Sequence, residues 1–345
     1  MKLIKYILCS VAIISMMSFV QSCKDSSDEP ELPNEENNSI AFFPFLEDGG
    51  VRFNSGFDDY NCVFPYIVKS DCFEIIDGKW YALEYNAYIS GGTDVNLLVN
   101  GEKKSTILSN CTSVQNAVAY QQDGRFKAYI FYFDADDNYH GVYYDNGEIK
   151  QIEGLTDFER ILFLKVINND VYIVWNFDVY NYYEIGNIVI TKNGIPIEQN
   201  LNLPKNSYVE YFSDLCVEDS TIYMFFTLVL DGYQKQAYYA KDNRIVKMEG
   251  LHTVGYGQVV NGRVYGLGTI YNEGQFCCYW EDGKITRIMP ESSPVSPRGL
   301  VVKNGNVYYF VTNYALEPDA SILFKNGEEL IRLDGECSGF RFFEY

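Results

Sequence analysis

Histidine is scarce in this chain, which has 345 residues and only two histidines, His140 and His252. Histidine-based catalytic triads and multi-histidine metal sites need several of these side chains, or one beside a nucleophile and a carboxylate. The two histidines fall in different parts of the sequence. The sequence therefore offers almost no histidine bases or ligands for such sites.

Positive charge is also in short supply. The chain has 27 Lys and Arg against 47 Asp and Glu, for a net charge of −20. Because phosphate binding relies on clustered Lys and Arg, nucleic acid is a poor candidate partner, and anionic polymers in general are disfavoured. The acidity is typical of a soluble, self-repelling surface.

Short catalytic motifs are missing as well. The sequence has no phosphate-binding loop, HExxH, GxSxG or CxxC pattern. The fragments Gly255-Tyr256-Gly257 and Gly266-Leu267-Gly268 lack both a third glycine and a following helix, so they favour strand or bend glycines. We expect no cofactor and no metal, and we assign no catalytic residue.

Long hydrophobic runs are absent except at the N-terminus. Lys2 and Lys5 precede an almost wholly apolar stretch over residues 6–20, which is shorter than the roughly twenty residues of a membrane-spanning helix and typical of a signal peptide. It ends at Val20-Gln21-Ser22-Cys23, which resembles the lipobox of bacterial lipoproteins. We predict a lipoprotein signal peptide over residues 1–22, lipidation of Cys23 and attachment to a membrane through that lipid.

The segment after Cys23 is acidic and poor in apolar residues, so residues 23–39 are predicted to form a flexible stalk. Loss of the signal peptide takes the net charge from −20 to −22, because Lys2 and Lys5 are removed and no acidic residue is. A lysine and then acidic residues directly after the lipidated cysteine resemble the export signal of Bacteroidetes surface lipoproteins. The resemblance implies an outer-membrane lipoprotein that faces the cell exterior.

Besides Cys9 and Cys23 the chain has seven cysteines: Cys62, Cys72, Cys111, Cys216, Cys277, Cys278 and Cys337. Disulfides form in extracytoplasmic compartments, yet the number is odd and the spacing does not resemble a small disulfide scaffold. Buried free thiols that pack as small hydrophobic groups are expected for most of them.

A repeat runs through the rest of the sequence. One hairpin turn recurs at Asp77-Gly78, Asp123-Gly124, Asn168-Asn169, Asp219-Ser220, Asn261-Gly262 and Asn304-Gly305. A second recurs at Asn100-Gly101, Asn146-Gly147, Asn193-Gly194, Asp242-Asn243, Asp282-Gly283 and Asn326-Gly327, in steps of 46, 47, 49, 40 and 44 residues. Such pairs accept the positive φ of a type I′ turn, so each predicts two antiparallel strands.

Two turns per period imply four strands per repeat, and four-stranded units of about 40 to 50 residues are typical of β-propeller blades. Thirty Tyr and 23 Phe fit many half-buried strand positions. The Gly-Lys-x-Tyr-like turns and aromatic-Asn-Gly endings also resemble the β-propeller domains of Bacteroides-type surface lipoproteins, over nearly all of residues 60–345. These motifs concern turns and packing and imply no activity.

We therefore predict an all-β fold in which residues 40–345 form a β-propeller of four-stranded antiparallel blades with six repeats. Residues 339–345 read as one more strand, and residues 40–55 contain Ile40-Ala41-Phe42-Phe43 and Val51-Arg52-Phe53. We expect these two ends of the chain to pair. Their pairing leaves six blades, or seven with a shared closing blade.

Aromatic residues near loop tips are the candidate ligand contacts, because flat rings exposed on loops stack on sugars or fill protein hot spots. Alternatively, they pack over blade edges. The candidate contact residues are Tyr139, Tyr180, Tyr182, Tyr183, Tyr233 and Tyr271; Tyr60, Tyr88 and Tyr314 share the pattern.

The acidic segment Asp134-Ala135-Asp136-Asp137-Asn138 begins like a calcium-binding loop, but Tyr139 stands where the turn glycine belongs. A solvated turn is therefore the favoured interpretation.

The leading functional hypothesis is a surface-displayed propeller that binds a glycan or a protein without catalysis. One alternative is a polysaccharide-acting hydrolase or lyase, whose two carboxylates cannot be found from sequence spacing. The arginines are scattered, and the Ser-x-Asp-x-Gly-x-Thr-Trp box of sialidases does not occur. A structural subunit of an outer-membrane complex is the other alternative.

Overall fold

The computed structural model describes residues 39–44, 50–54, 59–63, 70–85, 92–152, 160–177, 187–197, 201, 203–230, 234–271, 274–288, 295–316, 319–337 and 339–344. The predicted signal peptide and Cys23 lie outside these residues, as do Tyr180, Tyr182, Tyr183 and Tyr233. No helix in the described part of the chain is long and apolar enough to cross a membrane.

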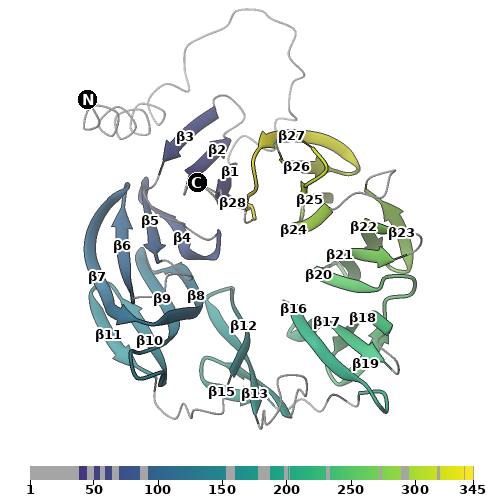
Figure 1. The fold of residues 1–345 in the computed structure, drawn as a ribbon, viewed down its shortest axis with the longest axis horizontal. Helices are drawn as coiled ribbons and strands as arrows, with labels where there is room; N and C mark the ends of the chain where they lie inside the picture. The colour runs from purple at the N-terminus through teal and green to yellow at the C-terminus, as the bar shows by residue number, and fades with distance from the viewer. Residues whose placement is uncertain are drawn as a thin grey trace, which may run out of the picture. The chain divides into compact units, whose positions relative to one another are not determined.

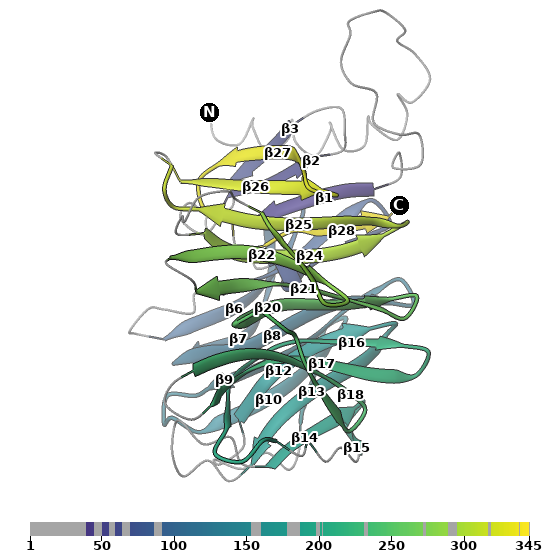
Figure 2. The same ribbon diagram turned by 90° about the vertical axis from the view of Figure 1, so that its right-hand side faces the viewer.

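The described strands form seven four-stranded sheets (Figures 1 and 2). The chain divides into two compact units, the first from Met1–Glu153 with Phe340–Tyr345 and the second from Gly154–Gly339. Six sheets each contain one predicted repeat, and the remaining sheet combines strands from both ends of the chain. The predicted all-β blade architecture is confirmed.

The first unit holds the mixed sheet and two repeat sheets. The mixed sheet has the order β28-β1-β2-β3, from β28 (Arg341–Glu344), β1 (Ser39–Pro44), β2 (Gly50–Asn54) and β3 (Asp59–Val63). β1 pairs antiparallel with β28, with Ile40 opposite Phe343, so the expected pairing of the chain ends is confirmed. Of the two blade counts left open, the one with a shared closing blade matches the sheets observed.

The two repeat sheets of this unit follow in chain order. One comprises β4 (Phe73–Ile76), β5 (Lys79–Glu84), β6 (Thr93–Val99) and β7 (Glu102–Cys111), preceded by the 3-10 turn η2 (Ser70–Cys72). The other comprises β8 (Ser113–Gln122), β9 (Arg125–Phe133), β10 (Tyr139–Asp145) and β11 (Glu148–Gln151).

The second unit holds four repeat sheets, each in simple chain order. The first two sheets comprise β12 (Arg160–Ile167), β13 (Asp170–Phe177), β14 (Asn187–Lys192) and β15 (Ile195–Ile197), and then β16 (Tyr208–Glu218), β17 (Thr221–Leu230), β18 (Gln234–Lys241) and β19 (Arg244–Lys247). The third sheet comprises β20 (Thr253–Val260), β21 (Arg263–Tyr271), β22 (Gln275–Glu281) and β23 (Lys284–Arg287). The fourth comprises β24 (Val295–Lys303), β25 (Asn306–Asn313), β26 (Ala320–Lys325) and β27 (Glu328–Asp334).

Tight turns join the first strand to the second and the third to the fourth in each repeat sheet. All twelve are the predicted Asn/Asp pairs, and the first residue of each has φ between 43° and 54°. Because the strands are antiparallel, these turns share one end of each sheet. The longer connections therefore gather at the opposite end, which we call the loop end.

The hydrophobic core lies between neighbouring sheets. In β17, Met224 and Phe226 pack into the core shared with β13 and β14, while Tyr223 and Phe225 pack into the core shared with β20 and β22. A central strand covered on both faces becomes apolar along nearly its whole length, and β17 is buried from Ile222 to Val229.

Six cysteines of the described chain are buried: Cys72, Cys111, Cys216, Cys277, Cys278 and Cys337. The expectation of buried free thiols is confirmed for Cys111, Cys216, Cys277 and Cys278.

Candidate functional site

A β-bulge recurs on the first strand of every sheet in the second unit. It falls six residues before the first hairpin turn and contains, in chain order, Leu162, Ser213, Gly255 and Arg298. A bulge adds an unpaired residue and changes where side chains point, and bulges occur often next to functional sites. Arg298 is the charged member of this set.

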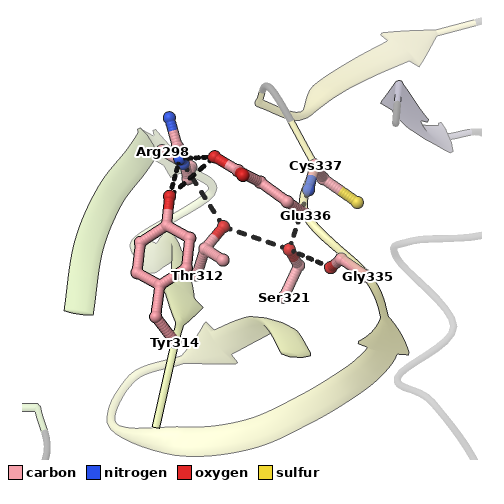
Figure 3. Close-up of polar contacts among 7 residues, drawn as sticks. All are labelled: Arg298, Thr312, Tyr314, Ser321, Gly335, Glu336 and Cys337. Carbon is pink, nitrogen blue, oxygen red and sulfur yellow. Dashed lines mark hydrogen bonds and ion pairs between the residues drawn. The ribbon is translucent and has the colours of Figure 1, made fainter. Parts of the chain in front are cut away.

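Arg298 is the centre of a polar cluster at the loop end of the sheet β24–β27 (Figure 3). Its guanidinium donates through Nη2 to the hydroxyl of Tyr314 and to Oε1 of Glu336. The Tyr314 hydroxyl in turn donates to Oε1 of Glu336 at 2.6 Å. Nε of Arg298 lies 3.3 Å from Oγ1 of the fully buried Thr312. The side chains of Arg298 and Glu336 are each 21% exposed, so the cluster borders solvent.

Ser321 fixes the backbone that carries Glu336. Its buried hydroxyl donates to the carbonyl of Gly335 at 2.8 Å and accepts the backbone N–H of Cys337 at 2.9 Å. These two bonds flank Glu336 on both sides (Figure 3). Gly335 adopts φ of 99°, a conformation that favours glycine, and its N–H donates to the carbonyl of Asp319 at 2.7 Å. The Glu336 carboxylate is therefore held toward Arg298 by the fold.

The cluster combines one positive, one negative and one neutral side chain, which form hydrogen bonds with one another. Burial raises the pKa of Tyr314, and its hydrogen bond to Glu336 raises it further, against the lowering effect of the Arg298 charge. The phenol is thus a protonated hydrogen-bond donor at neutral pH. A tyrosine nucleophile or base would need the opposite pKa shift.

Tyr314 shares the sequence pattern of the loop aromatics, but that pattern marks neither Arg298 nor Glu336. The three residues come from three different segments, after β25, on β24 and after β27. The one signal that could have found Arg298 is its position in the repeat, six residues before a first hairpin turn.

Two of the candidate ligand-contact residues lie in the described chain. Tyr271, the last residue of β21, is 46% exposed at the loop end, and its role as a ligand contact stays a prediction. Tyr139 is only 8% exposed, because its ring packs 6.3 Å from Phe131 and 5.1 Å from Phe133 between ring centroids. The prediction of Tyr139 as an exposed contact is therefore wrong; it packs over a strand pair, the alternative that the sequence left open.

The acidic segment at Asp134 forms a hydrogen-bonded turn. Oδ1 of Asp134 accepts the backbone N–H groups of Asp136 and Asn138, each at 2.9 Å, and Oδ2 lies 2.7 Å from Nε2 of His140. The bond to His140 is the main reason that the pKa of Asp134 is lowered. Within the described residues no group of three or more His, Cys, Asp or Glu side chains is placed to hold a metal ion. The favoured interpretation of this segment as a turn is confirmed.

No protein-family model matches the sequence, and no curated protein matches it either. Solved structures do resemble the fold. The β-propeller domain of the trilobed protease from Pyrococcus furiosus, described as having an open velcro topology, aligns with a TM-score of 0.52 and 18% identity over 85% of this chain and 93% of that one.

A dihydro-heme d1 dehydrogenase aligns with a TM-score of 0.52 and 10% identity over 92% of this chain and 77% of its own. A prolyl endopeptidase aligns with a TM-score of 0.54 and 9% identity over 90% of this chain, which spans half the length of that enzyme. At these identities the likeness concerns the fold alone, and it identifies the architecture as a β-propeller.

Proposed function

We propose that the chain is a lipid-anchored propeller, displayed at the cell surface, that binds a glycan or protein ligand at its loop end without chemical turnover. The observation that carries this proposal is the closed pairing within the Arg298–Tyr314–Glu336 cluster. Arg298 and Tyr314 both direct their hydrogen bonds to Glu336, so the groups best suited to acid–base or nucleophilic work at this end are committed to one another.

The sequence of residues 1–39 supports the anchored part of the proposal. A lipid on Cys23 and an acidic stalk would hold the propeller away from the bilayer, where a large extracellular ligand can reach it. A single acyl chain binds a membrane only reversibly, and stable attachment needs a second chain or another membrane-binding signal.

The rival function is a polysaccharide-acting enzyme. One observation favours it: Tyr314, Glu336 and Arg298 are the residue types that sialidases combine in their active sites, and here they lie in direct contact. A rearrangement that frees Glu336 from Arg298 would be needed before Tyr314 could act as a nucleophile.

One experiment separates the two functions. The full-length protein, kept in a detergent that carries no sugar, is incubated with a panel of polysaccharides, and both retention and released reducing ends are measured. Retention without release supports binding. Release that disappears in Tyr314→Phe and Glu336→Gln would establish the enzyme and overturn the proposal.

A further inference from the structure

Two exposed tyrosines lie at the loop end of neighbouring sheets in the second unit. Tyr211 on β16 is 37% exposed and Tyr271 on β21 is 46% exposed; the other large exposed hydrophobic residues in the described chain are Ile149 and Ile195. Both aromatic members of this group therefore belong to one region. Exposed aromatic rings at loop ends are costly to keep in water and often serve binding.

A bulge explains why Tyr211 reaches solvent. In a regular strand exposed and buried residues alternate, but Glu210 and Tyr211 are exposed in succession between the buried Val209 and Phe212. The pairing of β16 with β17 shifts register between Val209 and Tyr211, with Glu210 as the extra residue. The bulge thus directs a carboxylate and a phenol ring out of the sheet together.

Tyr271 is held in a defined orientation by His252. The backbone N–H of Tyr271 donates to Nδ1 of His252 at 3.1 Å, and the two rings meet edge to face with centroids 5.7 Å apart. Because Nδ1 accepts this bond, the neutral imidazole carries its proton on Nε2 and can donate a hydrogen bond from there. The backbone N–H of His252 itself donates to the carbonyl of Thr269 at 3.0 Å.

Lys235 on β18 pairs with Glu210, the residue beside Tyr211. Its ammonium lies 2.6 Å from Oε1 of Glu210. The pKa of Lys235 is raised, first by this hydrogen bond and also by its electrostatic interactions with Tyr271 and Tyr211. Gln236, which follows Lys235, donates through Nε2 to the carbonyl of Leu251, which precedes His252, at 2.7 Å. Tyr211, Tyr271, Lys235, Glu210 and His252, which we call the tyrosine patch, therefore lie together at the loop end of the sheets β16–β19 and β20–β23.

We propose that the tyrosine patch binds a neutral polysaccharide, with sugar rings stacked on Tyr211 and Tyr271 and sugar hydroxyls bonded to the Glu210–Lys235 pair. This inference rests on the proposed binding function and specifies its ligand and location. The electron-rich face of a tyrosine ring attracts the C–H groups on the flat side of a pyranose. A carboxylate beside an ammonium offers an acceptor and a donor to neighbouring hydroxyls.

Charge determines the class of ligand. The ion pair leaves the patch without net charge, while the whole chain carries −20, so an anionic polymer would be repelled over the approach. A protein partner is disfavoured because charged residues are depleted in the cores of protein interfaces, whereas this patch contains the Glu210–Lys235 ion pair. A neutral sugar chain is not repelled by the acidic protein, and its hydroxyls can bond to the ion pair.

The test is affinity electrophoresis and calorimetry of the full-length protein with amylopectin, laminarin, xyloglucan and galactomannan, and with polygalacturonate as the anionic probe. We expect binding to at least one neutral polysaccharide. Tyr211→Ala and Tyr271→Ala should each weaken it about thirtyfold, the lower bound of a binding hot spot. Tyr271→Phe should keep most of the affinity because the ring remains. Ile195→Ala is the control, since Ile195 is 70% exposed on β15, outside the patch.

Circular dichroism and melting temperature of each variant separate lost binding from lost folding. Binding to a neutral polysaccharide that neither alanine variant weakens would overturn the patch and leave the proposed binding function standing. Preference for polygalacturonate would overturn the ligand class. Binding to none of the five probes would overturn the patch proposal, and released sugar would overturn the proposed function itself.

Discussion

Asp214 joins three neighbouring sheets through one buried carboxylate, and its removal should destabilise the second unit strongly. Its Oδ1 accepts hydrogen bonds from the ammonium of Lys165 on β12 at 2.6 Å and from the backbone N–H of Leu215 at 2.8 Å. Oδ2 accepts the N–H of Gly257 on β20 at 3.1 Å. Asp214 is 7% exposed and Leu215 is fully buried.

The expected cost of Asp214→Ala follows from these contacts. Each buried N–H that loses its acceptor costs about 1–3 kcal/mol, and two such groups are stranded, those of Leu215 and Gly257. The ion pair adds little, about 1 kcal/mol or less, because the Lys165 side chain is 38% exposed and regains water. The free energy of unfolding should therefore fall by about 3–5 kcal/mol, and the melting temperature by about 10 °C for a unit of this size.

Urea and thermal unfolding followed by far-UV circular dichroism measure this change, and two further variants divide it. Lys165→Met removes the charge alone and should cost at most about 1 kcal/mol. Asp214→Asn keeps one acceptor oxygen and should fall between the other two. The reasoning is refuted if Asp214→Ala costs less than about 1 kcal/mol, or if Lys165→Met costs as much as Asp214→Ala.

Three other predictions concern a glutamate, a pair of glycines and the lipid anchor. Burial raises the pKa of the Glu84 carboxyl above its value in the unfolded chain. The folded protein therefore binds this proton more tightly, and the free energy of unfolding should fall as pH rises through the raised pKa. Glu84→Gln should remove this pH-dependent fall, because the amide does not titrate. Urea midpoints that depend on pH equally in the variant and the wild type would contradict the prediction. Gly257→Ala would place a Cβ 2.1 Å from the ring of the fully buried Phe225, whereas the Cβ of Gly255→Ala would lie 3.5 Å from its nearest neighbour, Cβ of Pro297, an ordinary van der Waals contact. The first should cost about 3 kcal/mol or more and the second under about 1 kcal/mol in urea unfolding, and equal costs would count against the packing argument. Cys23→Ala should release the protein from the membrane fraction, and continued membrane association would disprove the lipid tether.

Local sequence chemistry was sufficient to predict the strand pairs. The Asn-Gly and Asp-Gly pairs of the repeat, such as Asn261-Gly262, adopt positive φ at little cost, so each of them forms a hairpin between two strands of its sheet. The pairing of β1 with β28 could also be predicted, because an unpaired strand at each end of a repeat array needs a partner.

Other features depend on residues that are distant in the sequence. Tyr139 follows a polar loop and has the pattern of an exposed aromatic residue, yet it is buried because Phe131 and Phe133 on the neighbouring strand cover its ring. Tyr211 is exposed because a single extra residue, Glu210, interrupts the alternation of its strand. No local pattern in the sequence marks either outcome.

By itself, then, the sequence determined the repeat, the two turns in each blade and the end at which the long connections gather, since all of these follow from turn conformation and strand alternation. Only the tertiary structure decided that Arg298, Tyr314 and Glu336 form one cluster, and that Tyr211 and Tyr271 lie at the same loop end as the Glu210–Lys235 pair. The physical reason is that hairpin formation depends on a few neighbouring residues, whereas these sites depend on β-bulges and on contacts between different strands and sheets.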